Sequence, residues 1–218
     1  MTKHLQGAPR VTLFRPLILT LCALALTAAP AAADEDAQAA DPDWPCDQIL
    51  VPRIAAATLW DGPPVDGLAW RANAPVADLV GRLTQPGLSE EAAGSAVAAF
   101  AQGLAPAERA LLLTLVFAGV LEVLDQERAQ QLDGIRRYSQ DQARRAEALG
   151  LELDQMVALE RDPSEAAAKE RAALKERLTL EERVFDEREK SIGFLCTRPV
   201  VLEQRLGFLA RTIAGFMD

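Results

Sequence analysis

The chain has 218 residues, half of them hydrophobic, and its 32 acidic residues outnumber its 23 basic residues to give a net charge of −9. An acidic surface is repelled by phosphate backbones and by anionic lipid headgroups, so neither nucleic acid nor a membrane surface is the expected partner. A single histidine, His4, and three cysteines leave few side chains for acid–base catalysis or metal ligation.

The first 33 residues have the features of an export signal. Lys3, Arg10 and Arg15 supply positive charge, residues 17–29 form an apolar core, and residues 31–33 give an A-x-A cleavage pattern. The apolar core is too short to span a bilayer. We therefore expect cleavage after residue 33 and export into a bacterial periplasm. An uncleaved amino-terminal anchor is the alternative.

Removal of this signal would also remove His4, Cys22 and three basic residues, leaving 20 basic against 32 acidic residues and a net charge of −12. The mature chain would then lack the commonest general base and metal ligand. It carries no C-x-x-C pair, no nucleophile elbow and no phosphate-binding loop. We expect no enzyme activity, no cofactor and no stable membrane insertion, with a glycosidase built from carboxylates alone as the remaining enzyme alternative.

Residues 34–42 are rich in alanine and aspartate and predict a disordered acidic leader. A calcium loop would need oxygen ligands at alternate positions and a glycine at its turn. Pro42, Trp44 and Pro45 interrupt that spacing and no glycine follows. No metal site is therefore expected here.

Residues 43–75 contain all three tryptophans and predict an irregular strap laid across helices. A short helix over residues 53–60 would end at Asp61-Gly62, where the glycine accepts a positive φ. Tryptophans in an irregular segment usually anchor it to a core. The alternative is that these side chains contact a ligand or a partner. The candidate contact residues are Trp44, Trp60, Trp70 and Arg71.

Everything after residue 75 is predicted to be helical. One helix should run from Pro75 to Thr84 behind a cap at Asn73 or Ala74, and a second from a Ser89 cap to about Gly103. A third helix, from Pro106, meets no strong stop before Asp162-Pro163. Residues 110–124 of that helix are apolar almost all round, which predicts burial on several sides.

The remainder of the third helix predicts one half of a coiled-coil hairpin. Its inward series, at alternating steps of three and four, is 132, 135, 139, 142, 146, 149, 153, 156 and 160, with Ser139 and Gln142 as polar interruptions. A fourth helix restarts at an Asp162 cap and runs to about Phe194. Its series is 174, 178, 181, 185, 188, 192 and 195. These series favour an antiparallel hairpin over residues 125–195, with one long helix bent through Pro163 as the alternative.

A last helix is expected from Pro199, after a break at Thr197-Arg198. Its inward series is Leu202, Leu206, Leu209, Ile213 and Phe216. The predicted fold is therefore all-α: a helical head made of residues 76–124 and 198–217, a coiled-coil hairpin stalk, and the tryptophan-rich strap.

Cys46 and Cys196 are the cysteines that would remain after signal cleavage. Export supplies an oxidising compartment, and Cys196 falls where the fourth helix should give way to the last. We expect a disulfide that pins the strap to this junction. A free thiol or a metal ligand is the alternative.

Three short stretches carry a resemblance. Asp43-Trp44-Pro45-Cys46, then Trp60-Asp61-Gly62-Pro63, and finally residues 202–211 (LEQRLGFLAR) resemble uncharacterised exported bacterial helical proteins. The resemblance implies no activity.

A narrow hairpin buries little apolar surface per residue, and such elements are usually kept because a partner docks on them. We expect a non-catalytic interaction or scaffold protein of the periplasm, binding a protein partner or forming a homo-oligomer through its helical seams. The alternative is a small-ligand-binding periplasmic protein that uses the tryptophan strap.

Overall fold

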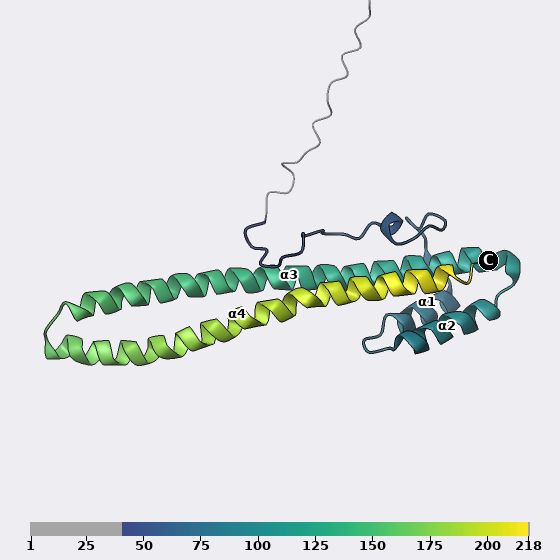
Figure 1. The fold of residues 1–218 in the computed structure, drawn as a ribbon. Helices are drawn as coiled ribbons and strands as arrows, with labels where there is room; N and C mark the ends of the chain where they lie inside the picture. The colour runs from purple at the N-terminus through teal and green to yellow at the C-terminus, as the bar shows by residue number, and fades with distance from the viewer. Residues whose placement is uncertain (1–40, 218) are drawn as a thin grey trace, which may run out of the picture. The chain divides into compact units, whose positions relative to one another are not determined.

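The computed structural model describes residues 41–217, so the predicted signal and residues 34–40 of the predicted leader lie outside the described residues. Within the described part there are four α-helices, two 3-10 turns and no strand, which confirms the all-α class. The elements are η2 (Ala56–Thr58), η3 (Trp70–Ala72), α1 (Ala74–Leu83), α2 (Glu90–Gln102), α3 (Pro106–Glu160) and α4 (Glu165–Ala214) (Figure 1).

The long helices α3 and α4 form an antiparallel hairpin. The chain reverses between Glu160 and Glu165, so the alternative of one bent helix through Pro163 is wrong. The cap of α4 is Ser164, whose side chain accepts the Ala167 N–H, and not Asp162 as expected. Asp162 instead accepts the Ser164 N–H at 2.9 Å and so shapes the turn just before the helix.

Helix α4 is continuous through Pro199, so the predicted break at Thr197-Arg198 and a separate last helix are wrong. A proline inside a helix removes one backbone hydrogen bond at a cost of about 3 kcal/mol. Packing on both sides of Pro199 outweighs this cost, because the inward series predicted before the proline and the one predicted after it lie on the same face of one continuous helix. The steps 188, 192, 195, 199, 202, 206 alternate between four and three without interruption, and Pro199 itself is buried.

The face that α3 turns toward α4 differs from the prediction beyond Gln142. Leu149 and Met156 are half-buried as predicted, but positions 145, 152 and 159 are half-buried in place of the predicted 146, 153 and 160, which are exposed. Polar contacts across the hairpin agree with this change in the inward face of α3. Arg177 forms an ion pair with Glu152 at 3.0 Å, and Arg171 donates to the Leu159 carbonyl at 2.8 Å. The rotation leaves Leu153 46% exposed.

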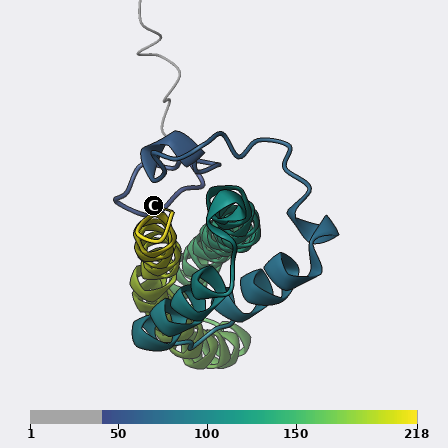
Figure 2. The same cartoon turned by 90° about the vertical axis from the view of Figure 1, so that its right-hand side faces the viewer.

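The hydrophobic core lies at the end of the hairpin where α3 begins and α4 ends. It combines α1 and α2 with the apolar stretch of α3 and the last turns of α4, as expected for the head. Its fully buried large side chains include Leu79, Leu83, Val97, Leu113, Phe117, Leu124, Leu206, Leu209 and Ile213. Two views at right angles place the strap along one side of the α3–α4 pair and α2 on the other (Figures 1 and 2).

The capping residues of the short helices are those the sequence indicates. Asn73 accepts the Val76 N–H at the start of α1, and Ser89 accepts the Ala92 N–H at the start of α2. Between these helices Gly87 has φ +79°, a conformation that favours glycine. These local signals fix the ends of both helices.

Two expectations for the strap are wrong. The helix over residues 53–60 shrinks to η2, and Gly62 does not have a positive φ. Gly62 is needed for a different reason: a Cβ there would lie 2.6 Å from the Trp60 ring. Asp41, placed in the disordered leader by the sequence, instead pairs with Arg136 of α3 at 2.7 Å.

Candidate partner-binding groove

Two buried charged residues of α3 hold the strap against the hairpin. Asp125, 3% exposed, accepts the Arg53 Nε–H at 2.6 Å and the Ile54 backbone N–H at 3.0 Å. Arg128, 4% exposed, donates to the Val51 carbonyl at 2.7 Å and to Glu203 of α4 at 2.6 Å. Each buried charge is thus paired and hydrogen-bonded, as burial of a charge requires. Arg128 in particular joins the strap, α3 and α4 at one point.

Trp60 and Trp70, two predicted contact residues, are core anchors with 6% exposure each. The Trp60 ring stacks on Phe117 with centroids 4.2 Å apart and has Gly62 against it. The Trp70 ring lies close to Gly119 of α3. Their indole N–H groups donate within the chain, to the Pro63 carbonyl and to Glu122. Neither ring is free for a ligand to stack on.

Arg71 is occupied as well. Its guanidinium lies 4.1 Å from the centre of the Trp70 ring and bonds Glu122 of α3 at 2.7 Å. Hydrogen bonds from Trp70 and then Arg71 hold the pKa of the Glu122 carboxyl below its ordinary value, outweighing the opposing effect of burial. The trio fastens the end of the strap to α3.

The amino-terminal end of the strap is fastened to α4 by the expected Cys46–Cys196 disulfide, with Cα atoms 5.6 Å apart. Beside it the Gln48 side chain donates to the Cys196 carbonyl at 2.8 Å. Trp44, the remaining predicted contact residue, is half-buried and donates its indole N–H to the Gln48 carbonyl. These contacts fold residues 44–48 into a tight loop held on α4.

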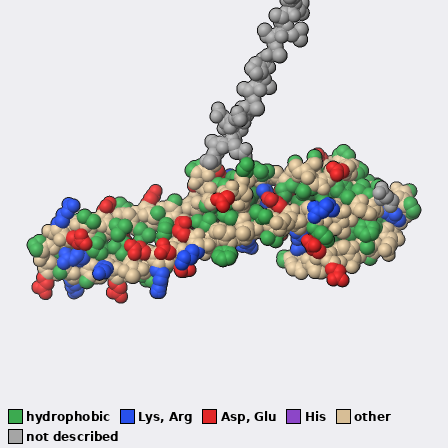
Figure 3. All heavy atoms as spheres, in the orientation of Figure 1, with side chains coloured by type: hydrophobic (Ala, Val, Ile, Leu, Met, Phe, Trp, Pro, Cys, Tyr) green, Lys and Arg blue, Asp and Glu red, His purple; other side chains and the backbone are tan. Residues whose placement is uncertain are grey.

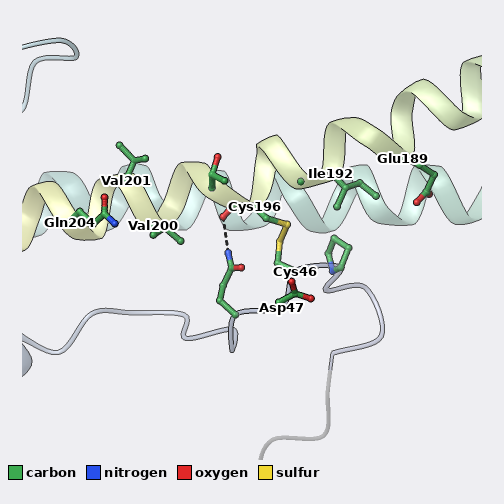
Figure 4. A pocket seen from close by; sticks show the side chains of 12 residues that line it. Cys46, Asp47, Glu189, Ile192, Cys196, Val200, Val201 and Gln204 are labelled. Carbon is green, nitrogen blue, oxygen red and sulfur yellow. Dashed lines mark hydrogen bonds between the residues drawn. A yellow bond between two sulfur atoms is a disulfide. The ribbon is translucent and has the colours of Figure 1, made fainter.

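A groove with a volume of about 680 Å³ runs along this disulfide between the loop and α4. It extends along α4 from Glu189 to Gln204, about four helical turns (Figure 4). Ile192, Val200 and Val201 contribute apolar side chains, and Pro45 adds another from the strap. The disulfide and the Gln48 hydrogen bond hold the loop beside α4, and the loop forms one wall of the groove.

The apolar surface continues past the rim of the groove. Val201 is 59% exposed, and Phe194, seven residues earlier and so on the same side of α4, is 77% exposed. Phe194 adjoins Gly193 in sequence and stands one turn before Thr197, both of which line the groove. An aromatic ring this exposed beside a concave surface is typical of a binding site.

Asp47 and Glu189 place two carboxylates on the lining of the same groove (Figure 4). Neither forms an ion pair with any of residues 41–217. The exposed Arg198 lines a different cavity, between α3 and α4. The groove therefore combines an apolar surface with negative charge.

A polar cluster crosses the hairpin further along. Gln142, 4% exposed, donates to the Phe185 carbonyl and accepts from Arg188, which also bonds Asp141 at 2.7 Å and lies 4.3 Å from the centre of the Tyr138 ring. Burial opposes ionisation of Asp141, but a hydrogen bond from Arg145 and the charges of Arg145, Arg188 and Arg144 together lower its pKa. Gln142 of the predicted α3 series and Arg188 of the predicted α4 series are thus partners, and their bond favours one register of the hairpin.

Other kinds of site are not seen in the part of the chain that the structure describes. No group of three or more acidic, histidine or cysteine side chains among residues 41–217 could hold a metal ion. Nor does any helix of this part have the length and apolar character needed to cross a membrane. Across the hairpin, charged side chains of both signs alternate over the exposed surface (Figure 3).

The sequence indicated the Cys46–Cys196 link that joins the two walls, but not the groove, because its shape depends on how residues 44–48 fold beside α4. The buried pair Asp125 and Arg128 was also missed. A signal for that pair existed: both positions lie just after the apolar stretch and continue its inward face at helical spacing. The exposed Phe194 gave no signal, since its exposure depends on which face of α4 packs.

Comparisons with models of protein families, with curated proteins and with solved structures find no match to this chain. The resemblance to exported bacterial helical proteins stays a prediction.

Proposed function

We propose that this protein is an exported, non-catalytic interaction or scaffold protein of the bacterial periplasm, which binds a protein partner or another copy of itself through the α3–α4 hairpin. The disulfide supports an oxidising compartment such as the periplasm. The inward positions of α3 up to Gln142 and those of α4, spaced three or four residues apart, support coiled-coil character in the hairpin.

The observation that carries the proposal is where the large exposed apolar side chains lie. Seven of the ten found among the described residues sit on α3 and α4 between residues 151 and 201. They are Leu151, Leu153, Val157, Leu180, Val184, Phe194 and Val201. Large apolar side chains that stay in contact with water on both helices of the hairpin offer contacts that a partner can cover.

No observation favours the small-ligand alternative. That alternative needs tryptophan rings open to a ligand, but Trp60 and Trp70 are buried and their N–H groups are bonded within the chain. For enzyme activity, the groove offers the two carboxylates of Asp47 and Glu189 beside apolar groups and a disulfide.

The test is photo-crosslinking in the producing cell. A benzophenone amino acid placed at Leu151 or Leu180 should give discrete crosslinked species, because these side chains point away from the hairpin core. The same group at Asp78, exposed on α1, is the control. If the hairpin positions give no more crosslinked product than Asp78, the proposed function is wrong.

A further inference from the structure

We infer that the groove between residues 44–48 and α4 binds an apolar segment of a partner protein that carries Lys or Arg side chains. This inference rests on the proposed function and names the partner chemistry of one surface of the hairpin. The groove and its surroundings show the shape, the apolar contacts and the charge that such a segment needs.

The shape suits a peptide segment. The groove follows α4 for about four turns, which matches the length of a short helix or an extended stretch of chain. One wall is helix α4 and the other is the loop held by the disulfide. Because the loop is fixed at Cys46 and again at Gln48, the binding surface is already formed and no ordering of the strap is needed on binding.

The apolar contacts point to an amphipathic occupant. Val201 and Phe194 stand one above the other on the exposed side of α4, while Ile192 and Val200 point to other sides of the helix and line the groove nearer the loop (Figure 4). Phe194 stands just outside the rim of the groove, where its exposed ring adds an aromatic contact for the apolar face of the partner.

The negative charge of the groove favours a partner segment that carries positive charge. Asp47 on the loop and Glu189 on α4 line the groove, and neither is neutralised by a basic residue of the described chain. A partner with Lys or Arg beside its apolar residues would pair with both carboxylates. A neutral or acidic segment would leave them unpaired or bring like charges together.

The same argument disfavours two other occupants. The residues that directly precede the described chain include Asp34, Glu35 and Asp36, so this segment of the protein itself would bring negative charge to the groove. A second copy of a chain with net charge −9 would do the same on average. A basic partner is the occupant that the charges favour.

A pair of synthetic 15-residue peptides tests the charge and the place of binding. Both have the same leucines on one face, and one carries lysines where the other carries glutamates. Fluorescence anisotropy of labelled peptide should show saturable binding of the lysine peptide alone. Phe194→Ala should weaken that binding about tenfold, whereas Leu111→Ala, an exposed leucine of α3 that is not one of the seven hairpin positions, should leave it unchanged.

A matched pair of charge variants separates a local effect from net charge. Asp47→Lys combined with Glu189→Lys should weaken lysine-peptide binding at least about fivefold more than Glu147→Lys combined with Asp154→Lys, which makes the same change in net charge on exposed α3 positions. Equal weakening by both pairs would overturn the inference. Equal binding of the two peptides would overturn it too.

Crosslinking in cells distinguishes failure of this inference from failure of the proposed function. A benzophenone at Phe194 should crosslink a different protein, and the crosslinked segment, once sequenced, should be apolar with a net positive charge. Crosslinks at Leu151 or Leu180 without any at Phe194 would contradict binding in the groove but would agree with the proposed function. Crosslinks from Phe194 only to residues 1–40 or to a second copy would also refute it. No crosslinks at any of these positions would refute both.

Discussion

The indole ring of Trp70 lies so close to Gly119 of α3 that there is room at that position for a hydrogen atom and nothing larger. A Cβ added to Gly119 would stand 2.8 Å from Cδ2 of Trp70 and 2.6 Å from Cγ2 of Val80. The strap, α1 and α3 therefore meet at a glycine. A glycine in the interior of a helix is otherwise a disadvantage.

Gly119→Ala should destabilise the protein by about 1–3 kcal/mol, because the added methyl group overpacks this contact. Gly150→Ala is the matched control: it makes the same substitution in the same helix, where a Cβ meets nothing within 4 Å. That control should stabilise the protein by up to about 1 kcal/mol, since alanine favours the helix. Urea unfolding of both variants gives the two free energies, and a stabilising Gly119→Ala would contradict the contact.

Arg128→Ala should destabilise the protein by about 3 kcal/mol. It leaves Glu203 without its partner and the Val51 carbonyl without its donor, and it removes a buried stem from the core. Arg137→Ala changes an exposed arginine of the same helix and should stay within about 0.5 kcal/mol of the wild type. Similar unfolding free energies for the two variants would show that the strap is not fastened through Arg128.

The contribution of Glu122 to stability should depend on pH. Its pKa is lower in the folded chain than the ordinary value of 4.5, so ionised Glu122 stabilises the fold above that value and this stabilisation is lost as the pH falls through the folded pKa. The free-energy difference between wild type and Glu122→Gln should therefore be full near pH 7 and shrink below about pH 4.5.

The check is a series of urea unfolding curves from pH 7 to pH 3. In an Arg71→Ala background the pH-dependent part of the difference should be smaller, because one of the two hydrogen bonds that lower the pKa is gone. If the free-energy difference between wild type and Glu122→Gln grew toward low pH, the pKa of Glu122 would have to be raised in the folded chain and not lowered.

Loss of the disulfide should lower stability by up to about 5 kcal/mol, the value that the chain-entropy model gives for a loop closed across 150 residues. Cys46→Ser and Cys196→Ser should have equal effects, since either one opens the link. In the unreduced, unfolded wild type, mass spectrometry after alkylation should find Cys46 and Cys196 unmodified. Alkylation of both before reduction would exclude the bond.

Much of the fold follows from local signals in the sequence. The cap at Ser89 and the start of α3 at Pro106 were predicted, and Asn73 was one of the two predicted caps of α1, because each depends on a few neighbouring residues. The hairpin and the pairing of Cys46 with Cys196 followed from the apolar series and the cysteine count. The continuity of α4 could have been predicted as well, since its two apolar series are in phase across Pro199 and only the proline suggested a break.

The groove and the rotated face of α3 could not be predicted in the same way. The series beyond Gln142 places Leu153 inward, but in the structure Arg145 and Glu152 take half-buried positions. Long charged side chains can do this because their stems lie along the seam while their ends reach Asp141 and Arg177. Which residues of α3 face inward therefore depends on the side chains that α4 presents, and the sequence of α3 alone does not show this.

Because Pro199 has no N–H to give to the Leu195 carbonyl, this turn is the weakest backbone link between the tip of α4 and its buried end. The cross-link at Cys196 and the hydrogen bond from Gln48 both attach the strap to α4 on the amino-terminal side of Pro199. On the carboxyl-terminal side, Glu203 of α4 binds Arg128, which also donates to the Val51 carbonyl of the strap. Residues 46–51 of the strap are therefore attached to α4 on both sides of Pro199 and bridge the turn at which one helical hydrogen bond is missing.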